Sequence, residues 1–267
     1  MGTLVVDKAL VIMQKYQTNE ERTAEYLKNL TREKTLQFLI PDRNPIILDV
    51  GANVGGTIQE FKGFWPEAII HAFEPQEECW SDLESVKSAF PSGDIVINRT
   101  AVGNVFSEGL VFFTHDMSKG TSGFNKINLG SLDSVHLKQL QESDHQKVSD
   151  YEKTLNHERR VPVIRLDKYM SSHAIDRANL LKIDTQGYEP EVLEGLGDRL
   201  RDVDVVLTEL MFFDYYERSL SFSDIERFLL PAGFHLYDIS HISKNPMNGR
   251  TDWVDVIYVN NRLRRKK

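Results

Sequence analysis

The segment between Ile46 and Glu74 constrains the fold of this chain more than any other. A short apolar run ends in Asp49, a glycine-rich turn occupies residues 51–56, and a helix-compatible stretch leads to a second apolar run at residues 68–73. Strand, glycine turn, helix, strand and acid, in this order, are typical of the βαβ unit that opens nucleotide-binding α/β sheets. Glycines allow the positive φ angles of such a turn and let a ligand approach the backbone. Glu74 follows the second strand and is placed to accept hydrogen bonds from two ribose hydroxyls.

The side chain at the middle of the turn indicates which ligand fits. A dinucleotide-binding turn reads G-x-G-x-x-G, and its middle glycine leaves bare backbone for a pyrophosphate. Asn53 occupies that position here and would crowd a pyrophosphate. S-adenosylmethionine (SAM) has no phosphate, and the ammonium of its amino-acid tail suits Asp49, while the exposed amides of the turn suit its carboxylate. The segment therefore predicts SAM as the cofactor.

Two small residues are expected to complete the cofactor site. Residues 94–98 are predicted to form a third strand, and ligands of such sheets bind outside the carboxyl ends of the strands. Ala101 and Val102 follow that strand and suit packing against an adenine ring. The predicted cofactor-binding residues are Asp49, Gly51, Asn53, Gly55, Glu74, Pro75, Ala101 and Val102.

The composition indicates an ordinary globular protein, with 40% apolar and 27% charged residues in a chain of 267. The net charge of -8 argues against a general nucleic-acid binder, which usually has a basic face. Cys79 is the only cysteine, so an internal disulfide is excluded. The chain has neither a signal-peptide pattern nor an apolar run that could span a bilayer. We therefore expect a cytoplasmic enzyme whose partner is a small-molecule substrate.

The N-terminal part of the chain precedes the nucleotide-binding unit and has helical spacing. Thr18 or Asn19 can cap one helix, and residues from Thr31 onward can form another. We expect a helical cap over residues 1–44, followed by a SAM-binding domain over residues 45–267. The oligomeric state stays open, with a homo-oligomer formed through the N-terminal helices as one option.

An insertion at about residues 114–160 interrupts the regular pattern of the domain. Residues 131–160 contain no glycine and no proline and are rich in polar side chains. Structureless loops of this length are uncommon unless they are functional or disordered. Two interpretations stay open at this point, a lid that selects the substrate and a solvated excursion.

The connection before the last predicted strand indicates its direction. Residues 240–253 contain Pro246 and Gly249 and have no helical period. A parallel crossover usually needs a helix, so an antiparallel final hairpin is the better interpretation. The chain is therefore predicted to form a doubly wound, Rossmann-like α/β sheet, mostly parallel, with an antiparallel last strand. Nicotinamide-binding domains have an all-parallel sheet, so this strand counts against them.

A series of short motifs occurs in order between residues 46 and 259. They read DVGANVGG at 49–56, FEP at 73–75, AVGN at 101–104, GTSG at 120–123, LD at 166–167 and LLKIDTQGYE at 180–189. This series resembles FkbM-type SAM-dependent methyltransferases, which have the class I methyltransferase fold. The resemblance implies methylation of a hydroxyl on a sugar, a glycoconjugate or a natural product. In one departure, Gln186 replaces the usual acid of the last motif, which puts in doubt any role of that acid in binding a metal or orienting the substrate.

The expected chemistry needs a group that takes the proton of the acceptor hydroxyl, either a base or a metal-bound species. Asp184 and Glu209 are predicted to end adjacent central strands on the ligand side. His241 follows the next strand, and histidine titrates near neutral pH. The catalytic candidates are therefore Asp184, Glu209 and His241, with His115 at the mouth of the insertion held in reserve. We expect the acceptor site between the three candidates and residues 131–160.

Three alternatives stay open from the sequence. The two acids, Asp184 and Glu209, could bind a divalent cation, because hard cations prefer oxygen ligands, although no metal site is predicted. A SAM-binding regulatory protein would share every cofactor motif and differ only near the acceptor, where Gln186 is the first departure. A nicotinamide-dependent oxidoreductase would share the glycine turn, but Asn53 and the final hairpin count against it.

Overall fold

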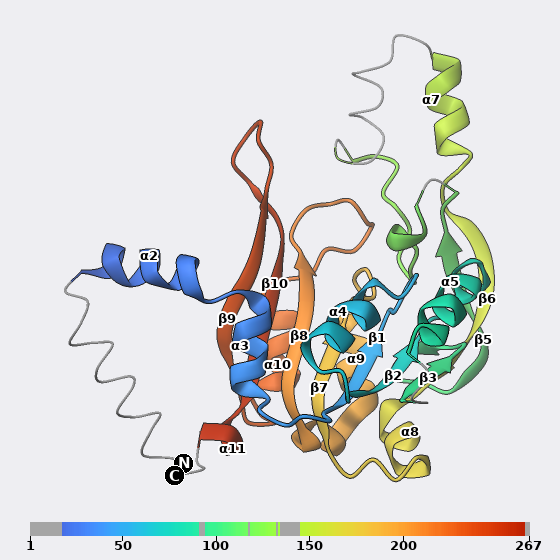
Figure 1. The fold of residues 1–267 in the computed structure, drawn as a ribbon. Coiled ribbons are helices and arrows are strands. Elements are labelled where there is room, and N and C mark those ends of the chain that lie inside the picture. The colour runs from blue at the N-terminus through green and yellow to red at the C-terminus, as the bar shows by residue number, and fades with distance from the viewer. Residues whose placement is uncertain (1–17, 91–93, 117, 132, 134–144, 265–267) are drawn as a thin grey trace.

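The computed structural model describes residues 18–90, 94–116, 118–131, 133 and 145–264. Its main body is a seven-stranded sheet in the order β3-β2-β1-β7-β8-β10-β9, with helices on both faces (Figure 1). The strands of this sheet are β1 Ile46–Val50, β2 Ile69–Phe73, β3 Ile95–Asn98, β7 Ala178–Ile183, β8 Val203–Met211, β9 Phe234–Lys244 and β10 Thr251–Asn260.

The strand directions confirm the predicted architecture. β1 runs parallel to β2 and β7, β2 to β3, and β7 to β8. β10 is antiparallel to both of its neighbours, β8 and β9. The sheet is therefore doubly wound and Rossmann-like, with its last strand inserted in the opposite direction, as the turn residues before that strand predict. The final hairpin is longer than predicted, because β9 continues to Lys244 instead of ending near residue 239.

A second, smaller sheet lies beside the carboxyl end of β3, and the sequence did not predict it as a separate sheet. Its order is β4-β6-β5, formed by β4 Ala101–Val102, β5 Ser107–Thr114 and β6 His157–Ile164. β6 is parallel to β4 and antiparallel to β5. The last residues of the predicted insertion therefore belong to a strand, which pairs with β5 through residues far apart in the sequence.

The described part of the insertion is packed against the loop that follows β8. Its helix α7, His145–Glu152, buries Val148 in a small apolar cluster with Ile127, Leu155 and Tyr216. Residues 117, 132 and 134–144 of the insertion lie outside the described residues. Whether this segment selects the substrate stays a prediction.

Two apolar clusters cover the two faces of the main sheet. Because side chains alternate along a strand, Val205 and Leu207 of β8 belong to one cluster, while Val206 and Leu210 belong to the other. The first face packs against α3 Arg32–Leu39, α4 Gly56–Phe64 and α5 Glu77–Ser88, and the second against α8 Leu166–Ser172, α9 Glu189–Leu196 and α10 Phe222–Leu229.

The two described N-terminal helices begin close to the predicted residues. Thr18 caps α2, Asn19–Asn29, and Thr31 caps α3. Only α3 joins the core, where Leu36 is fully buried. α2 buries no residue, and its Tyr26 hydroxyl donates a hydrogen bond to Asp238 on β9. The boundary of a separate helical cap at residue 44 stays a prediction, and residues 1–17 lie outside the described residues.

Three segments extend beyond the carboxyl ends of the parallel strands, where the glycine turn also lies. Figure 1 shows them as the β9–β10 hairpin, the loop after β8 and the segment that carries α7. Within the described ranges, no helix is long and apolar enough to cross a membrane. The remaining short helices are η1 Lys119–Thr121, η3 Gly197–Asp202 and α11 Asn261–Arg264.

Candidate active site

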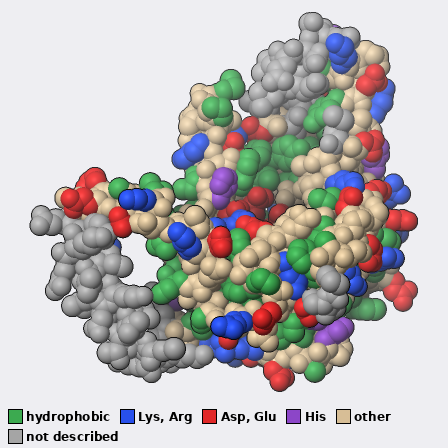
Figure 2. All heavy atoms as spheres, viewed as in Figure 1, with side chains coloured by type: hydrophobic (Ala, Val, Ile, Leu, Met, Phe, Trp, Pro, Cys, Tyr) green, Lys and Arg blue, Asp and Glu red, His purple; other side chains and the backbone are tan. Residues whose placement is uncertain are grey.

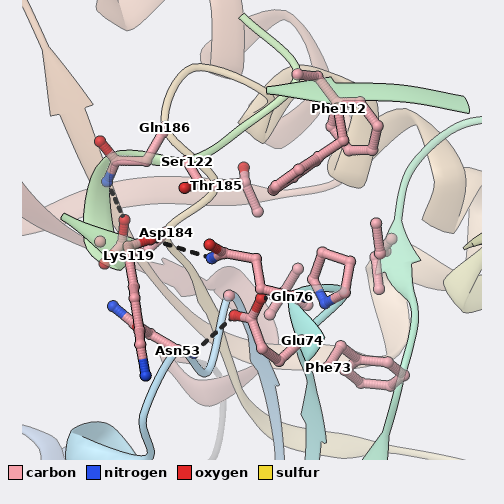
Figure 3. A pocket seen from close by; sticks show the side chains of 17 residues that line it. Asn53, Phe73, Glu74, Gln76, Phe112, Lys119, Ser122, Asp184, Thr185 and Gln186 are labelled. Carbon is pink, nitrogen blue, oxygen red and sulfur yellow. Dashed lines mark hydrogen bonds between the residues drawn. The ribbon is translucent and has the colours of Figure 1, made fainter. Parts of the chain in front are cut away.

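The first cavity, of about 520 Å³, lies at the carboxyl ends of β1, β2 and β7 and extends to the small sheet. Figure 3 shows Asn53 and Glu74 at one side of it and Phe112 at the other. The lining residues are Val50, Gly51, Asn53, Phe73, Glu74, Pro75, Gln76, Ala101, Val102, Phe112, Lys119, Gly120, Ser122, Phe124, Asp184, Thr185 and Gln186.

Two glycines of the turn combine a positive φ angle with close neighbours. Gly51 has a φ of +80°, and a Cβ there would lie 1.9 Å from the carbonyl oxygen of Asp184. Gly55 has a φ of +87°, and its Cβ would lie within 3.1–3.3 Å of Leu83 and Val86 in α5. The turn therefore brings the ends of β1 and β7 into contact. Asn53 also has a positive φ, of 47°, which asparagine tolerates better than most residues.

The carboxylate of Glu74 is fixed by two backbone amides. The N–H groups of Asn53 and Gln76 each donate to one of its oxygens at 2.8 Å, and the residue is only 3% exposed. Burial raises the pKa of Glu74, and the two amide hydrogen bonds act in the opposite direction. Each oxygen accepts one of these bonds, so a second lone pair on each stays available for a ligand.

Apolar side chains form the far wall of the first cavity. Ala101 and Val102 line it from β4, and the rings of Phe112 and Phe124 pack edge to face with centroids 5.2 Å apart. Sequence reasoning found the two small residues and missed the two phenylalanines. The sequence feature that could have located them is the GTSG turn at residues 120–123, which returns to β5 by pairing Gly123 with Phe113.

Asp49 does not line this cavity, which is a correction to its predicted contact with the amino-acid tail of the cofactor. Neighbouring residues of a strand point to opposite faces, so Asp49 lies on the other face from Val50, which does line the cavity. The Asp49 carboxylate is fully buried and lies 3.2 Å from the ammonium of Lys182. That ammonium also donates to the carbonyl oxygen of Gly51 at 2.7 Å. The pair therefore supports the turn from beneath.

Gln186 links the two predicted catalytic acids. Its Nε2 donates to Asp184 Oδ1 at 2.7 Å and lies 3.5 Å from Glu209 Oε1, while its own oxygen accepts from the Tyr216 hydroxyl at 2.8 Å. Burial, with the negative charges of Asp184 and Asp255, raises the pKa of Glu209 to about 9. Glu209 therefore carries a proton near neutral pH. The neutral amide of Gln186 stands where the family motif has an acid, so it adds no further negative charge next to these two carboxyl groups.

A second cavity, of about 380 Å³, adjoins the first, and Asp184 lines both. It lies over the α3 and α4 side of the sheet, where Arg32 of α3 contacts Glu60 of α4 and Asp255 of β10. The residues lining it are Arg32, Thr57, Glu60, Lys182, Ile183, Asp184, Leu207, Thr208, Glu209 and Asp255.

Comparison with known proteins assigns this chain to a family. The model of the methyltransferase FkbM domain matches residues 49–236, which is more than half of the chain. The chain belongs to this family.

Two relatives show how far the similarity extends. Methyltransferase 1 of Beauveria bassiana (strain ARSEF 2860) is 27% identical over 172 residues, which cover 64% of this chain and 66% of that protein. The FkbM methyltransferase of Methylobacillus flagellatus KT has a TM-score of 0.49 and 14% identity, covering 90% of this chain and 52% of that one. The chain thus spans about two thirds of the first protein and about half of the second.

A second solved structure matches over nearly its whole length. Magnesium protoporphyrin IX methyltransferase from Synechocystis PCC 6803 has a TM-score of 0.44 and 10% identity, covering 97% of this chain and 96% of that one.

The FkbM domain brings two of the three predicted catalytic residues together. Asp184 directly follows β7, Glu209 lies in the adjacent strand β8, and both accept from Gln186. His241 does not lie in a loop after its strand, as predicted, but within β9, opposite Asp255 of β10. Its side chain is exposed and lines neither cavity. The reason is that the hairpin strands continue several residues beyond the predicted end.

His115, the reserve candidate, lines neither cavity. It is buried, and its Nδ1 accepts a hydrogen bond from the backbone N–H of Asn156 at 2.9 Å. Burial lowers the pKa of His115 to about 4, so it stays neutral at physiological pH. In the part of the chain that the structure describes, no group of three or more acidic, histidine or cysteine side chains is arranged to hold a metal ion.

Proposed function

We propose that this chain transfers a methyl group from SAM to a hydroxyl oxygen of a small molecule. The observation that carries the proposal is the position of Asp184, which lines both cavities. A cofactor in the first cavity and an acceptor in the second would meet at this residue. Family membership supports the reaction class, and the carboxyl groups at the junction support oxygen as the acceptor atom.

The residues of the first cavity fit the parts of SAM in order. The free lone pairs of Glu74 suit the ribose diol, because each of its oxygens accepts only one backbone amide. The slot between the small residues of β4 and Phe112 suits adenine. Gly51 and Asp184 line the other end of the first cavity, where the amino-acid tail of SAM would lie beside the glycine turn. SAM supplies a methyl group that is already activated on a sulfonium, so binding and orientation are the main tasks of the chain.

Asp184 takes the proton of the acceptor hydroxyl in this proposal. The new bond joins the acceptor oxygen to the methyl carbon, the carbon–sulfur bond breaks, and the hydroxyl proton passes to Asp184. Glu209 carries a proton near neutral pH because burial raises its pKa, so it acts as a hydrogen-bond donor to the acceptor. Gln186 holds the carboxylate of Asp184 in place. His241, exposed on β9, is assigned no step.

The family resemblance supports sugar, glycoconjugate or natural-product hydroxyls as acceptors. A second candidate function is SAM binding without turnover, as in a regulatory protein. The observation that favours it is the short contact of 2.7 Å between Gln186 and Asp184, which occupies one lone pair of the proposed base.

The test has two stages. Calorimetry should first show binding of SAM and S-adenosylhomocysteine (SAH) and no comparable binding of NAD. Radiolabelled SAM and a panel of hydroxylated small molecules should then give labelled product with wild type, greatly reduced product with Asp184→Asn, and unchanged product with the control Asp198→Asn, whose side chain is 97% exposed. SAM binding together with no product from any hydroxyl acceptor would favour the regulatory alternative.

A further inference from the structure

The second cavity has a row of acidic side chains at its base. Glu209 of β8 lies directly opposite Asp255 of β10, and Asp255 lies opposite His241 of β9. Asp184 follows Ile183, whose partner on β8 is Thr208, so Asp184 is level with Glu209. Residues opposite one another share a face of the sheet, so the three acidic side chains, Asp184, Glu209 and Asp255, form one row, and His241 lies next to it on β9, outside both cavities. We call it the acidic row.

Both cations of the cavity are already paired with carboxylates. The guanidinium of Arg32 contacts Glu60 and lies 3.2 Å from Asp255. The ammonium of Lys182 lies 3.2 Å from Asp49 and 3.9 Å from Asp184. The cavity lining contains four carboxyl groups and two cations, and the carboxylates still outnumber the cations when Glu209 is protonated. An anionic ligand would therefore find no unpaired cation here and would face an excess of negative charge.

Apolar and aromatic side chains lie next to the acidic row on the outer side. Met211 and Trp253 are paired across β8 and β10, two residues further along than Glu209 and Asp255, and hence on the same face. The ring of Phe213 lies 6.5 Å from that of Trp253 and 5.7 Å from that of Tyr215. Figure 2 shows a hollow at this edge, with hydrophobic side chains above acidic ones.

We infer that the second cavity takes an acceptor with an uncharged or cationic polar group beside an apolar ring, and that it rejects anionic acceptors. Asp255 and Arg32 are the residues that set this selectivity. Asp255 adds negative charge to the acidic row and, together with Glu60, occupies the Arg32 guanidinium. In a partly buried site, repulsion between like charges disfavours a ligand of the same charge, so the site discriminates strongly between ligands of different charge. This inference rests on the proposed function, because it assigns the acceptor class of the same site.

Three probes that share one ring test the inference. Benzylamine, benzyl alcohol and benzoate differ in charge, and their binding to the full chain saturated with SAH is measured by ligand-observed NMR. We expect dissociation constants in the millimolar range for the first two, and for benzoate a value at least about tenfold higher, the scale of one repulsive contact. Asp255→Asn should reduce this difference, because it removes one carboxylate from the cavity and one of the two carboxylate partners of Arg32. Asp238→Asn, which changes the same charge on β9 outside both cavities, should leave the difference unchanged.

The possible results separate the proposed function from the charge selectivity. Failure of SAH to bind in the preceding calorimetry contradicts the proposed function itself. SAH binding combined with equal or tighter binding of benzoate overturns the charge selectivity alone, as does the absence of binding by all three probes. Retention of the wild-type preference in Asp255→Asn, with a melting temperature close to wild type, overturns the role given to Asp255 and Arg32.

Discussion

Replacement of Glu74 by glutamine tests the first cavity most sharply. The wild-type carboxylate accepts the N–H groups of Asn53 and Gln76, both at 2.8 Å. Glutamine keeps one oxygen and directs its NH₂ group toward the second amide, so one charged hydrogen bond is lost, and the ribose diol loses an acceptor. A hydrogen bond to a charged group contributes about 1.5–3 kcal/mol. We therefore expect the SAM dissociation constant to rise about 10- to 150-fold.

Calorimetric titration with SAM and SAH measures this change, and Glu77→Gln provides the matched control. Glu77 is exposed in the first turn of α5, three residues from Glu74, so its replacement should leave the dissociation constant within about twofold of wild type. Circular dichroism checks that Glu74→Gln is folded. An unchanged SAM affinity in a folded Glu74→Gln variant would refute the assignment of Glu74 to the ribose.

Four further predictions follow from the same geometry. Gly51→Ala should destabilise the fold by about 2–5 kcal/mol in chemical denaturation, because its Cβ would meet a carbonyl oxygen at 1.9 Å; a loss below about 1 kcal/mol contradicts this. Asp184→Asn should lower turnover about 10²-fold or more while changing SAM affinity less than tenfold, and full activity removes it as the base. Gln186→Glu should lower the melting temperature. Added Mg²⁺ or Ca²⁺ should raise the melting temperature of the variant again and leave that of wild type unchanged. Since the pKa of Glu209 rises from 4.5 to about 9 on folding, wild-type stability should fall between those pH values relative to Glu209→Gln; parallel stability–pH curves contradict the shift.

Local patterns were sufficient for the sheet and for the turn at its centre. The glycine turn and Glu74 lie within one βαβ unit, and the direction of β10 follows from Pro246 and Gly249 in the connection before it. These features depend on neighbouring residues, so a single sequence contains the information. Local patterns were not sufficient for Asp49, because its role depends on which face of β1 it occupies, and its partner Lys182 lies on another strand.

The cavity residues that were not predicted from the sequence are brought together by contacts between distant segments. Arg32 and Asp255 are separated by 223 positions, and only the packing of α3 beside β10 brings them together. The small sheet likewise joins β4 and β5 to β6 across the insertion, which places Phe112 in the first cavity. His241 was misplaced because the end of a hairpin strand depends on its pairing with β10, and periodicity alone does not set it.

The most direct test of this account is a crystal structure of the chain with SAH. The account predicts both ribose hydroxyls within hydrogen-bond distance of Glu74, adenine between Ala101 and Phe112, and the sulfur at the end of the first cavity nearest Asp184, facing the second cavity. Density for SAH in the second cavity, or in the first cavity with its sulfur directed away from Asp184, would contradict the arrangement of cofactor and acceptor proposed for this protein.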